Sequence, residues 1–274
     1  MNRKPRREAV AARMLHRYQR LGDLIARWTR LEYDGPAQLP DGPALLVANH
    51  GFGTMFDMNT YVLGALLKNH RGPNAAPLTI LTHDTAWTFG LGPWMELAGF
   101  KRANRTNAIE ALAAGHLVVV LPGGDVDAAK PFSHRNEVHF GGRTGFAEIA
   151  LQAGVPILPV VISGAGETVV VLSDGRRLAS LLGLPKRLRV KTLPISLSLP
   201  WGLTVGLSGM VLPYIPLPAK MRASVIEPMT PRPAEDAEVF AARVLAAMNA
   251  RMHQMTDGRL PFLGLAWPRR RPSR

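Results

Sequence analysis

A histidine and an aspartate that follow an apolar run are the residues of this chain best suited to acid–base chemistry. The run covers residues 44–48, and His50 and Asp57 follow it with six residues between them. Histidine exchanges its proton near neutral pH, and an aspartate on one ring nitrogen fixes the tautomer and stabilises the imidazolium. The other ring nitrogen can then accept a proton from a hydroxyl group. Such a pair would act as a general base on a bound substrate.

The segment between the two residues decides whether they can meet. Gly51 and Gly53 allow a tight backbone turn, which would bring Asp57 back to the imidazole. The backbone N–H groups of residues 51–53, or those of Gly123 and Gly124, are candidates for stabilising an oxyanion in the transition state. A second interpretation treats His50 as a structural histidine, because one histidine–aspartate spacing is weakly specific.

The amino-acid composition limits the types of reaction and the classes of partner that fit this chain. The 274 residues include no cysteine, which excludes disulfides, zinc–thiolate centres and thiol nucleophiles. HExxH and GxSxG patterns are also absent, so we expect neither a metal site, nor a cofactor, nor a serine nucleophile. The net charge is +13, with basic residues gathered at both ends, which favours an anionic partner. No nucleic-acid-binding motif accompanies this charge, so an anionic membrane surface or a phosphate-bearing substrate is the better match.

Short apolar runs alternate with helical patterns along most of the chain. We expect strands at 44–49, 78–82, 117–121 and 156–162, and helices at 58–68, 94–97, 105–114, 145–153 and about 240–255. This alternation predicts a single α/β domain with a mostly parallel central sheet flanked by helices. Ligand sites in such folds lie at the carboxyl ends of the strands, where His50 and the turn at residues 123–125 fall.

Both ends of the chain and one internal segment differ from this pattern. Residues 1–34 are predicted to form a basic amphipathic helical arm, residues 35–256 the main domain, and residues 257–274 a basic tail. The arm either packs on the domain or lies in a membrane interface. The segment 185–218 is apolar but interrupted by prolines, so it either adds sheet and turns or forms an apolar lobe with Trp201 and Tyr214 at a membrane. Neither a signal peptide nor a spanning helix is expected.

Four sequence blocks, in their order and spacing, resemble the glycerolipid acyltransferase superfamily over residues 43–168. They are Ala48-Asn49-His50 with Asp57, the segment RANRTNA, the segment LPGGD and the segment VPILP. The resemblance implies that His50 is the general base and Asp57 its orienting partner. It also implies that Arg105 lies near the polar head of the substrate. A third, substrate-binding block would comprise Pro122, Gly123, Gly124 and Asp125.

Two departures from the family pattern bear on the substrate. The usual first block has four residues between histidine and aspartate, so Met55 holds the usual aspartate position here. The third block lacks both the glutamate and the arginine of the phosphate-using members, and it has Gly124 and then Asp125. A carboxylate there would repel a phosphate. The resemblance therefore points to an uncharged acceptor and to the branch of monoacylglycerol and diacylglycerol acyltransferases.

The expected function is O-acyl transfer from acyl-coenzyme A, as co-substrate, to a hydroxyl of a neutral lipid or alcohol. Arg143 and Gly145 would place a cation and a helix N-terminus near a coenzyme A phosphate, or Arg143 would bridge loops. The protein would bind peripherally to the cytoplasmic face of a membrane. Two alternatives stay open: a 1-acylglycerol-3-phosphate (lysophospholipid) acyltransferase, and a non-catalytic protein that binds lipid membranes.

Overall fold

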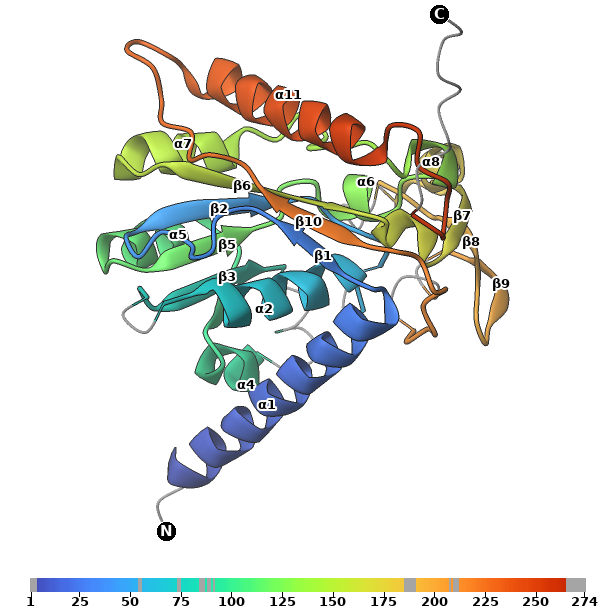
Figure 1. Ribbon diagram of the computed structural model, residues 1–274, viewed down its shortest axis with the longest axis horizontal. Coiled ribbons are helices and arrows are strands. Elements are labelled where there is room, and N and C mark those ends of the chain that lie inside the picture. Colours follow the sequence, from blue (N-terminus) through green and yellow to red (C-terminus); the bar gives the residue numbers. More distant parts are fainter. Residues whose placement is uncertain are drawn as a thin grey trace, which may run out of the picture.

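The computed structural model describes residues 4–53, 56–72, 75–83, 87, 90, 92–184, 191–206, 208 and 212–264 (Figure 1). A seven-stranded sheet forms its centre, in the order β1-β10-β6-β2-β5-β3-β4. The strands are β1 (Glu32–Asp34), β2 (Ala44–Ala48), β3 (Leu78–Thr82), β4 (Phe100–Arg102), β5 (Leu117–Val120), β6 (Ile157–Ser163) and β10 (Arg222–Val225). Only the pairing of β10 with β6 is antiparallel among the described strand pairs of this sheet. The predicted α/β class with a mostly parallel sheet is confirmed.

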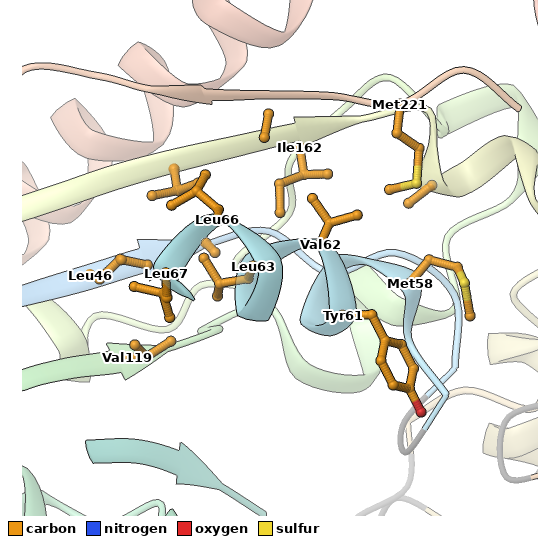
Figure 2. Close-up of a cluster of buried hydrophobic side chains, with 14 of the residues drawn as sticks. Leu46, Met58, Tyr61, Val62, Leu63, Leu66, Leu67, Val119, Ile162 and Met221 are labelled. Carbon is orange, nitrogen blue, oxygen red and sulfur yellow. The ribbon is translucent and has the colours of Figure 1, made fainter. Parts of the chain in front are cut away.

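Helices cover both faces of this sheet because alternate residues of its strands point to opposite sides. On β2, Leu46 belongs to a core beneath α2 (Met58–His70), and Figure 2 shows it beside Leu63 and Leu67. Its neighbours Leu45 and Val47 face the other core. That second core is formed with α5 (Arg105–Ala113), α7 (Gly145–Ala153) and α11 (Ala237–Thr256).

The N-terminal helix packs on α2, which is one of the two expectations for the arm. Helix α1 spans Lys4–Trp28, and its Tyr18 ring stacks on Tyr61 with centroids 4.9 Å apart. The Tyr18 hydroxyl donates to the Thr60 carbonyl oxygen at 2.8 Å. Burial raises the pKa of Tyr18, so this phenol stays neutral and can donate. Among the described residues, no helix combines the length and the apolarity needed to cross a membrane.

Segments on the far side of the expected boundaries, before residue 35 and after residue 256, contact the main domain. Strand β1 lies inside the segment expected to be the arm, yet it pairs with β10. Residues 257–264, expected to begin a basic tail, are tied to the domain through the buried Glu167. Its Oε2 accepts from Arg259 Nη2 at 2.8 Å and from the Phe262 N–H at 2.7 Å. Both segments are therefore tied to the main domain by these contacts.

The segment after β6 forms a separate small sheet. Its antiparallel strands are β7 (Val170–Ser173), β8 (Ile195–Ser198) and β9 (Gly202–Val205), and α8 (Arg176–Leu181) follows β7. Sheet and turns are thus present within the proline-interrupted segment, while its residues 185–190, 207 and 209–211 lie outside the described part.

Two short α-helices and two 3₁₀ turns also lie in the described part of the chain: α4 (Gly92–Leu97), α6 (Gly124–Ala128), η1 (Phe132–His134) and η2 (Ala165–Glu167). The sequence predicted a turn at residues 123–125, and the structure instead begins α6 there. The short α6 carries Asp127 beneath the end of β2, where the candidate site begins.

Candidate active site

His50 and Asp57 are in direct contact, as the glycine turn predicted. His50 follows the carboxyl end of β2, and Asp57 is the N-cap of α2. Nδ1 of His50 lies 2.7 Å from Oδ2 of Asp57. The Asp57 side chain is fully buried, whereas that of His50 is 17% exposed. Nδ1 is thus held by the carboxylate, and Nε2 is the nitrogen left for chemistry; the catalytic role itself stays a prediction.

Capping of α2 explains how Asp57 reaches His50 across six intervening residues. Oδ1 of Asp57 accepts the N–H groups of Asn59 at 2.8 Å and of Gly51 at 2.9 Å, so one carboxylate closes both ends of the loop. A Cβ at Gly51 would lie 2.7 Å from this oxygen and 2.8 Å from Cβ of Ala165. The position therefore needs glycine. Met55, at the usual aspartate position, lies outside the described residues.

The same hydrogen bonds correct one expectation about oxyanion stabilisation. The Gly51 N–H is donated to Asp57, and the Gly53 N–H is donated to the Ala128 carbonyl oxygen at 3.3 Å. Neither group is free to stabilise an oxyanion in this arrangement. The N–H groups of Phe52, Gly123 and Gly124 stay candidates from the sequence.

A buried ion pair holds the backbone of His50, and sequence reasoning missed it. Oδ2 of Asp127 accepts the His50 N–H at 2.6 Å, and Oδ1 pairs with Nζ of Lys130 at 2.6 Å. Lys130 Nζ also donates to the His50 carbonyl oxygen at 3.0 Å, and the His139 N–H donates to Asp127 Oδ1 at 3.0 Å. Both ionic side chains are buried. No sequence pattern marked this pair, because its role is a contact with the backbone of a residue far away in the sequence.

Asn49 fixes the strand end from the opposite side. Its Nδ2 donates to the Ile162 carbonyl oxygen at 3.0 Å, and its Oδ1 accepts the Ile162 N–H at 2.8 Å. The carbonyl oxygen of Asn49 in turn accepts from Nδ2 of Asn59 at 2.9 Å. Strands β2 and β6 and the start of α2 are therefore joined one residue before His50.

An aromatic wall stands next to this polar cluster. Phe52, two residues after His50, is buried, and its ring meets that of Tyr214 edge-on with centroids 6.2 Å apart. Burial raises the pKa of Tyr214, so its phenol is neutral, and the hydroxyl lies 3.4 Å from Oγ1 of Thr168. Both rings are buried, so this contact is part of the hydrophobic core next to His50.

The third block forms a turn that Arg143 bridges. Nη1 of Arg143 donates to the carbonyl oxygens of Pro122, at 3.1 Å, and of Gly123, while Nη2 pairs with Oδ1 of Asp125 at 2.9 Å. This geometry matches the loop-bridging interpretation of Arg143. Gly124 has a positive φ of 50°, which favours glycine. The cation of Arg143 is thus neutralised next to the substrate-binding block.

Arg105 and Gly145 occupy the first residues of two neighbouring helices. Arg105 begins α5, and its guanidinium pairs with Glu148 in the first turn of α7. Gly145 begins α7 itself. The Arg105–Glu148 pair is therefore a contact between α5 and α7, and the proposed contacts of Arg105 and Gly145 with substrate stay predictions.

Three side chains in the loop after α6 come close together, which the sequence did not predict. Ligand atoms of His134, Glu137 and His139 lie within 4.8 Å of one another, close enough to hold a metal ion. Oε2 of Glu137 lies 3.0 Å from Nδ1 of His134 and 3.0 Å from Nε2 of His139. Desolvation raises the pKa of Glu137, but the contacts with both imidazoles outweigh it and lower the pKa. These two hydrogen bonds account for the arrangement.

Asp127→Asn tests the buried ion pair. The substitution leaves Lys130 buried without a counter-charge, so we expect the free energy of unfolding to fall by about 3–5 kcal/mol. Urea denaturation followed by circular dichroism would measure it. Asp23→Asn is the control, because it breaks the exposed pair with Lys68 and should cost at most about 1 kcal/mol. Equal losses in the two variants would contradict a special role for the buried pair.

Gly123→Ala tests the close packing of the third block. A Cβ there would lie 2.5 Å from the His139 carbonyl oxygen, so backbone must move, and we expect a loss of about 1–3 kcal/mol in stability. Gly145→Ala is the matched control, since a Cβ there meets nothing within 4 Å. Thermal unfolding should therefore separate the two variants. If Gly145→Ala proved the more damaging, the described packing would be wrong.

Comparison with known proteins agrees with this geometry. Residues 30–163 match the model of the Acyltransferase family. The uncharacterized protein Rv0502 of Mycobacterium tuberculosis (H37Rv) is 33% identical over 204 residues, which are 74% of this chain and 52% of that protein. A Gallus gallus protein named "DGAT1/2-independent enzyme synthesizing storage lipids" is 26% identical over 236 residues, 85% of this chain and 63% of that protein.

A solved structure shows the same fold. It is the 1-acyl-sn-glycerophosphate acyltransferase PlsC from Thermotoga maritima, with a TM-score of 0.53 and 18% identity over 94% of this chain and 84% of that chain. The chain spans about half the length of the mycobacterial relatives it matches. The resemblance carried by the four sequence blocks is thereby confirmed over residues 30–163, just under half of the chain, which match the Acyltransferase family model.

Proposed function

We propose that this protein transfers a fatty acyl group from acyl-coenzyme A to the hydroxyl of a neutral lipid or alcohol. The single observation that carries the proposal is the 2.7 Å contact between Nδ1 of His50 and the buried carboxylate of Asp57. It fixes the imidazole with Nε2 as its free base. A hydroxyl bound at Nε2 would become a nucleophile at neutral pH.

The reaction needs one proton acceptor and one oriented thioester. Nε2 of His50 takes the hydroxyl proton while the acceptor oxygen bonds to the thioester carbonyl carbon. The tetrahedral intermediate then collapses, the carbon–sulfur bond breaks, and the imidazolium returns the proton to the sulfur of coenzyme A. The products are an ester and the free thiol. Asp57 accepts the Nδ1–H and stabilises the transient imidazolium throughout.

Charges around the third block support a neutral acceptor. Arg143 pairs with Asp125, and Arg105 pairs with Glu148, so both cations expected to attract a phosphate are neutralised by carboxylates. To pair with either arginine, a lipid phosphate would have to displace its carboxylate partner. The attraction between that arginine and carboxylate would then be lost. The similarity to an enzyme named for storage lipids agrees with an uncharged acceptor.

The second candidate is acyl transfer to a lysophosphatidate. The net charge of +13 favours an anionic substrate in general, and the fold matches that of a 1-acyl-sn-glycerophosphate acyltransferase. In either case the substrates are lipids, so we place the protein at the cytoplasmic face of a membrane as a peripheral protein, without a nucleic-acid partner.

His50→Ala tests the proposed chemistry. Without the general base, we expect the release of coenzyme A from a long-chain acyl-coenzyme A to fall by about 10²–10⁴-fold. A thiol-reactive dye measures that release. His253→Ala, at an exposed position of α11, is the control and should keep the wild-type rate. Unchanged turnover in His50→Ala would exclude His50 as the base, and no turnover by the wild type with any acceptor would favour a non-catalytic lipid-binding protein.

Acceptor preference separates the two candidates. We expect diacylglycerol, monoacylglycerol or a long-chain alcohol to be acylated faster than lysophosphatidate, because Asp125 repels the phosphate and neutralises Arg143. Asp125→Asn should raise the lysophosphatidate rate relative to the diacylglycerol rate. Product analysis by thin-layer chromatography would measure both. A wild-type enzyme that prefers lysophosphatidate would contradict the neutral-acceptor proposal.

A further inference from the structure

Two strands of the small three-stranded sheet, β8 and β9, turn polar side chains inward and apolar side chains outward. On β8, Ser196 and Ser198 are buried, while Leu197 between them is 49% exposed. Leu197 lies opposite Leu203 on β9, which is 63% exposed. An antiparallel sheet with one face in water normally shows the opposite alternation, with apolar residues in and polar residues out.

Hydrogen bonds on the inner side of this sheet stabilise the inverted arrangement. Oγ of Ser196 lies 2.9 Å from Oγ1 of Thr204, its cross-strand partner, so the buried hydroxyls satisfy each other. Thr204 Oγ1 also donates to the Ser196 carbonyl oxygen at 3.2 Å. The polarity is therefore built into the strand register, and a slip of one residue would be needed to reverse it. The outer face is made for an apolar environment.

The end of helix α1 is joined to the segment beside this sheet. Ile215 is exposed, and its N–H donates to the Leu199 carbonyl oxygen at 2.8 Å, next to the end of β8. Nε1 of Trp28 donates to the Pro216 carbonyl oxygen at 2.9 Å, which joins the end of α1 to the same segment. Figure 1 shows β7, β8 and β9 at one end of the molecule. We call this surface the apolar face; its exposed members include Leu21, Leu24, Trp28, Leu197, Leu203 and Ile215.

Cations border the apolar face along α1. Arg17, Arg20 and Arg27 are exposed and lie within one helical turn of Leu21 or Leu24. Two copies of the protein meeting through this face would bring these cations toward each other, which is unfavourable. Anionic headgroups would instead neutralise them while acyl chains cover the leucines. The apolar face also extends over both a helix and a sheet. A site for a single acyl chain would be narrower, so a bilayer is the better match.

We propose that the apolar face docks the protein on an anionic lipid bilayer, with the outer side of the β7–β9 sheet toward the acyl chains. The inference deepens the proposed function and rests on it in one respect, the lipid nature of the acceptor. Ile215 on this face is adjacent to Tyr214, whose ring contacts Phe52 beside His50. This series of contacts links the docking face to the hydrophobic core next to His50.

Vesicle flotation of the full chain tests this docking. The vesicles contain phosphatidylethanolamine and phosphatidylglycerol, and the variant is Leu197→Ser with Leu203→Ser, which removes an exposed cross-strand apolar pair without adding charge. We expect the partition coefficient to fall by about tenfold or more. Val239→Ser on α11 is the matched control, because Val239 is also exposed but lies outside the apolar face, and it should bind as wild type. Unchanged thermal unfolding would show that the variants fold.

A second variant tests the cations. Arg20→Gln with Arg27→Gln should reduce the preference for anionic over phosphatidylcholine vesicles, and added salt should do the same to the wild type. Wild-type binding by the leucine double variant would overturn the proposal. So would a wild-type dimer in analytical ultracentrifugation that the same variant converts to a monomer without loss of vesicle binding. Docking is measured without substrate, so an absence of acyl transfer would count against the proposed function alone.

Discussion

The buried pair of Asp127 and Lys130 is the interaction on which the site depends. Two opposite charges without water are stable only when every remaining hydrogen-bonding position is also filled. Here the positions are filled by the N–H and carbonyl groups of His50 and by the His139 N–H. The requirement to satisfy the charges therefore fixes the backbone at the end of β2. With that backbone fixed, a short glycine turn and the capping of α2 suffice to hold Asp57 at Nδ1 of His50.

The same principle, charges satisfied within the protein, shapes the surroundings of the pair. Arg143 donates to the carbonyl oxygen of Gly123 and pairs with Asp125, and Glu148 pairs with Arg105. These contacts stabilise the turn and the helix packing, and they also lower the positive potential that a phosphate would meet. In the proposal, the residues that hold the third block together also set its charge. The same contacts therefore stabilise the fold and favour a neutral acceptor.

The sequence predicted the central part of the fold well because apolar alternation is strong there. Strand β3 and helix α7 have the predicted bounds, and the His50–Asp57 contact was expected from the glycine turn. Strands β1 and β10 were missed because each is only three or four residues long and depends on pairing with a distant segment. Asp127 was missed because its role is a contact with the backbone of His50, 77 positions away, and side-chain patterns carry no information about that.

The joining of the two ends of the domain has a consequence for how the chain is made. Strand β1 can pair only after β10 has been synthesised. Similarly, Arg30 donates to the carbonyl oxygen of Phe262, which lies 232 positions later in the sequence. During synthesis α1 can pack on α2 early, since the two are close in the chain, but the edge of the sheet beside it stays open. Contacts of such high sequence separation form late and slowly. A nascent chain therefore exposes the edge of β6 until nearly the whole domain has left the ribosome, which makes this edge the place where premature association would start.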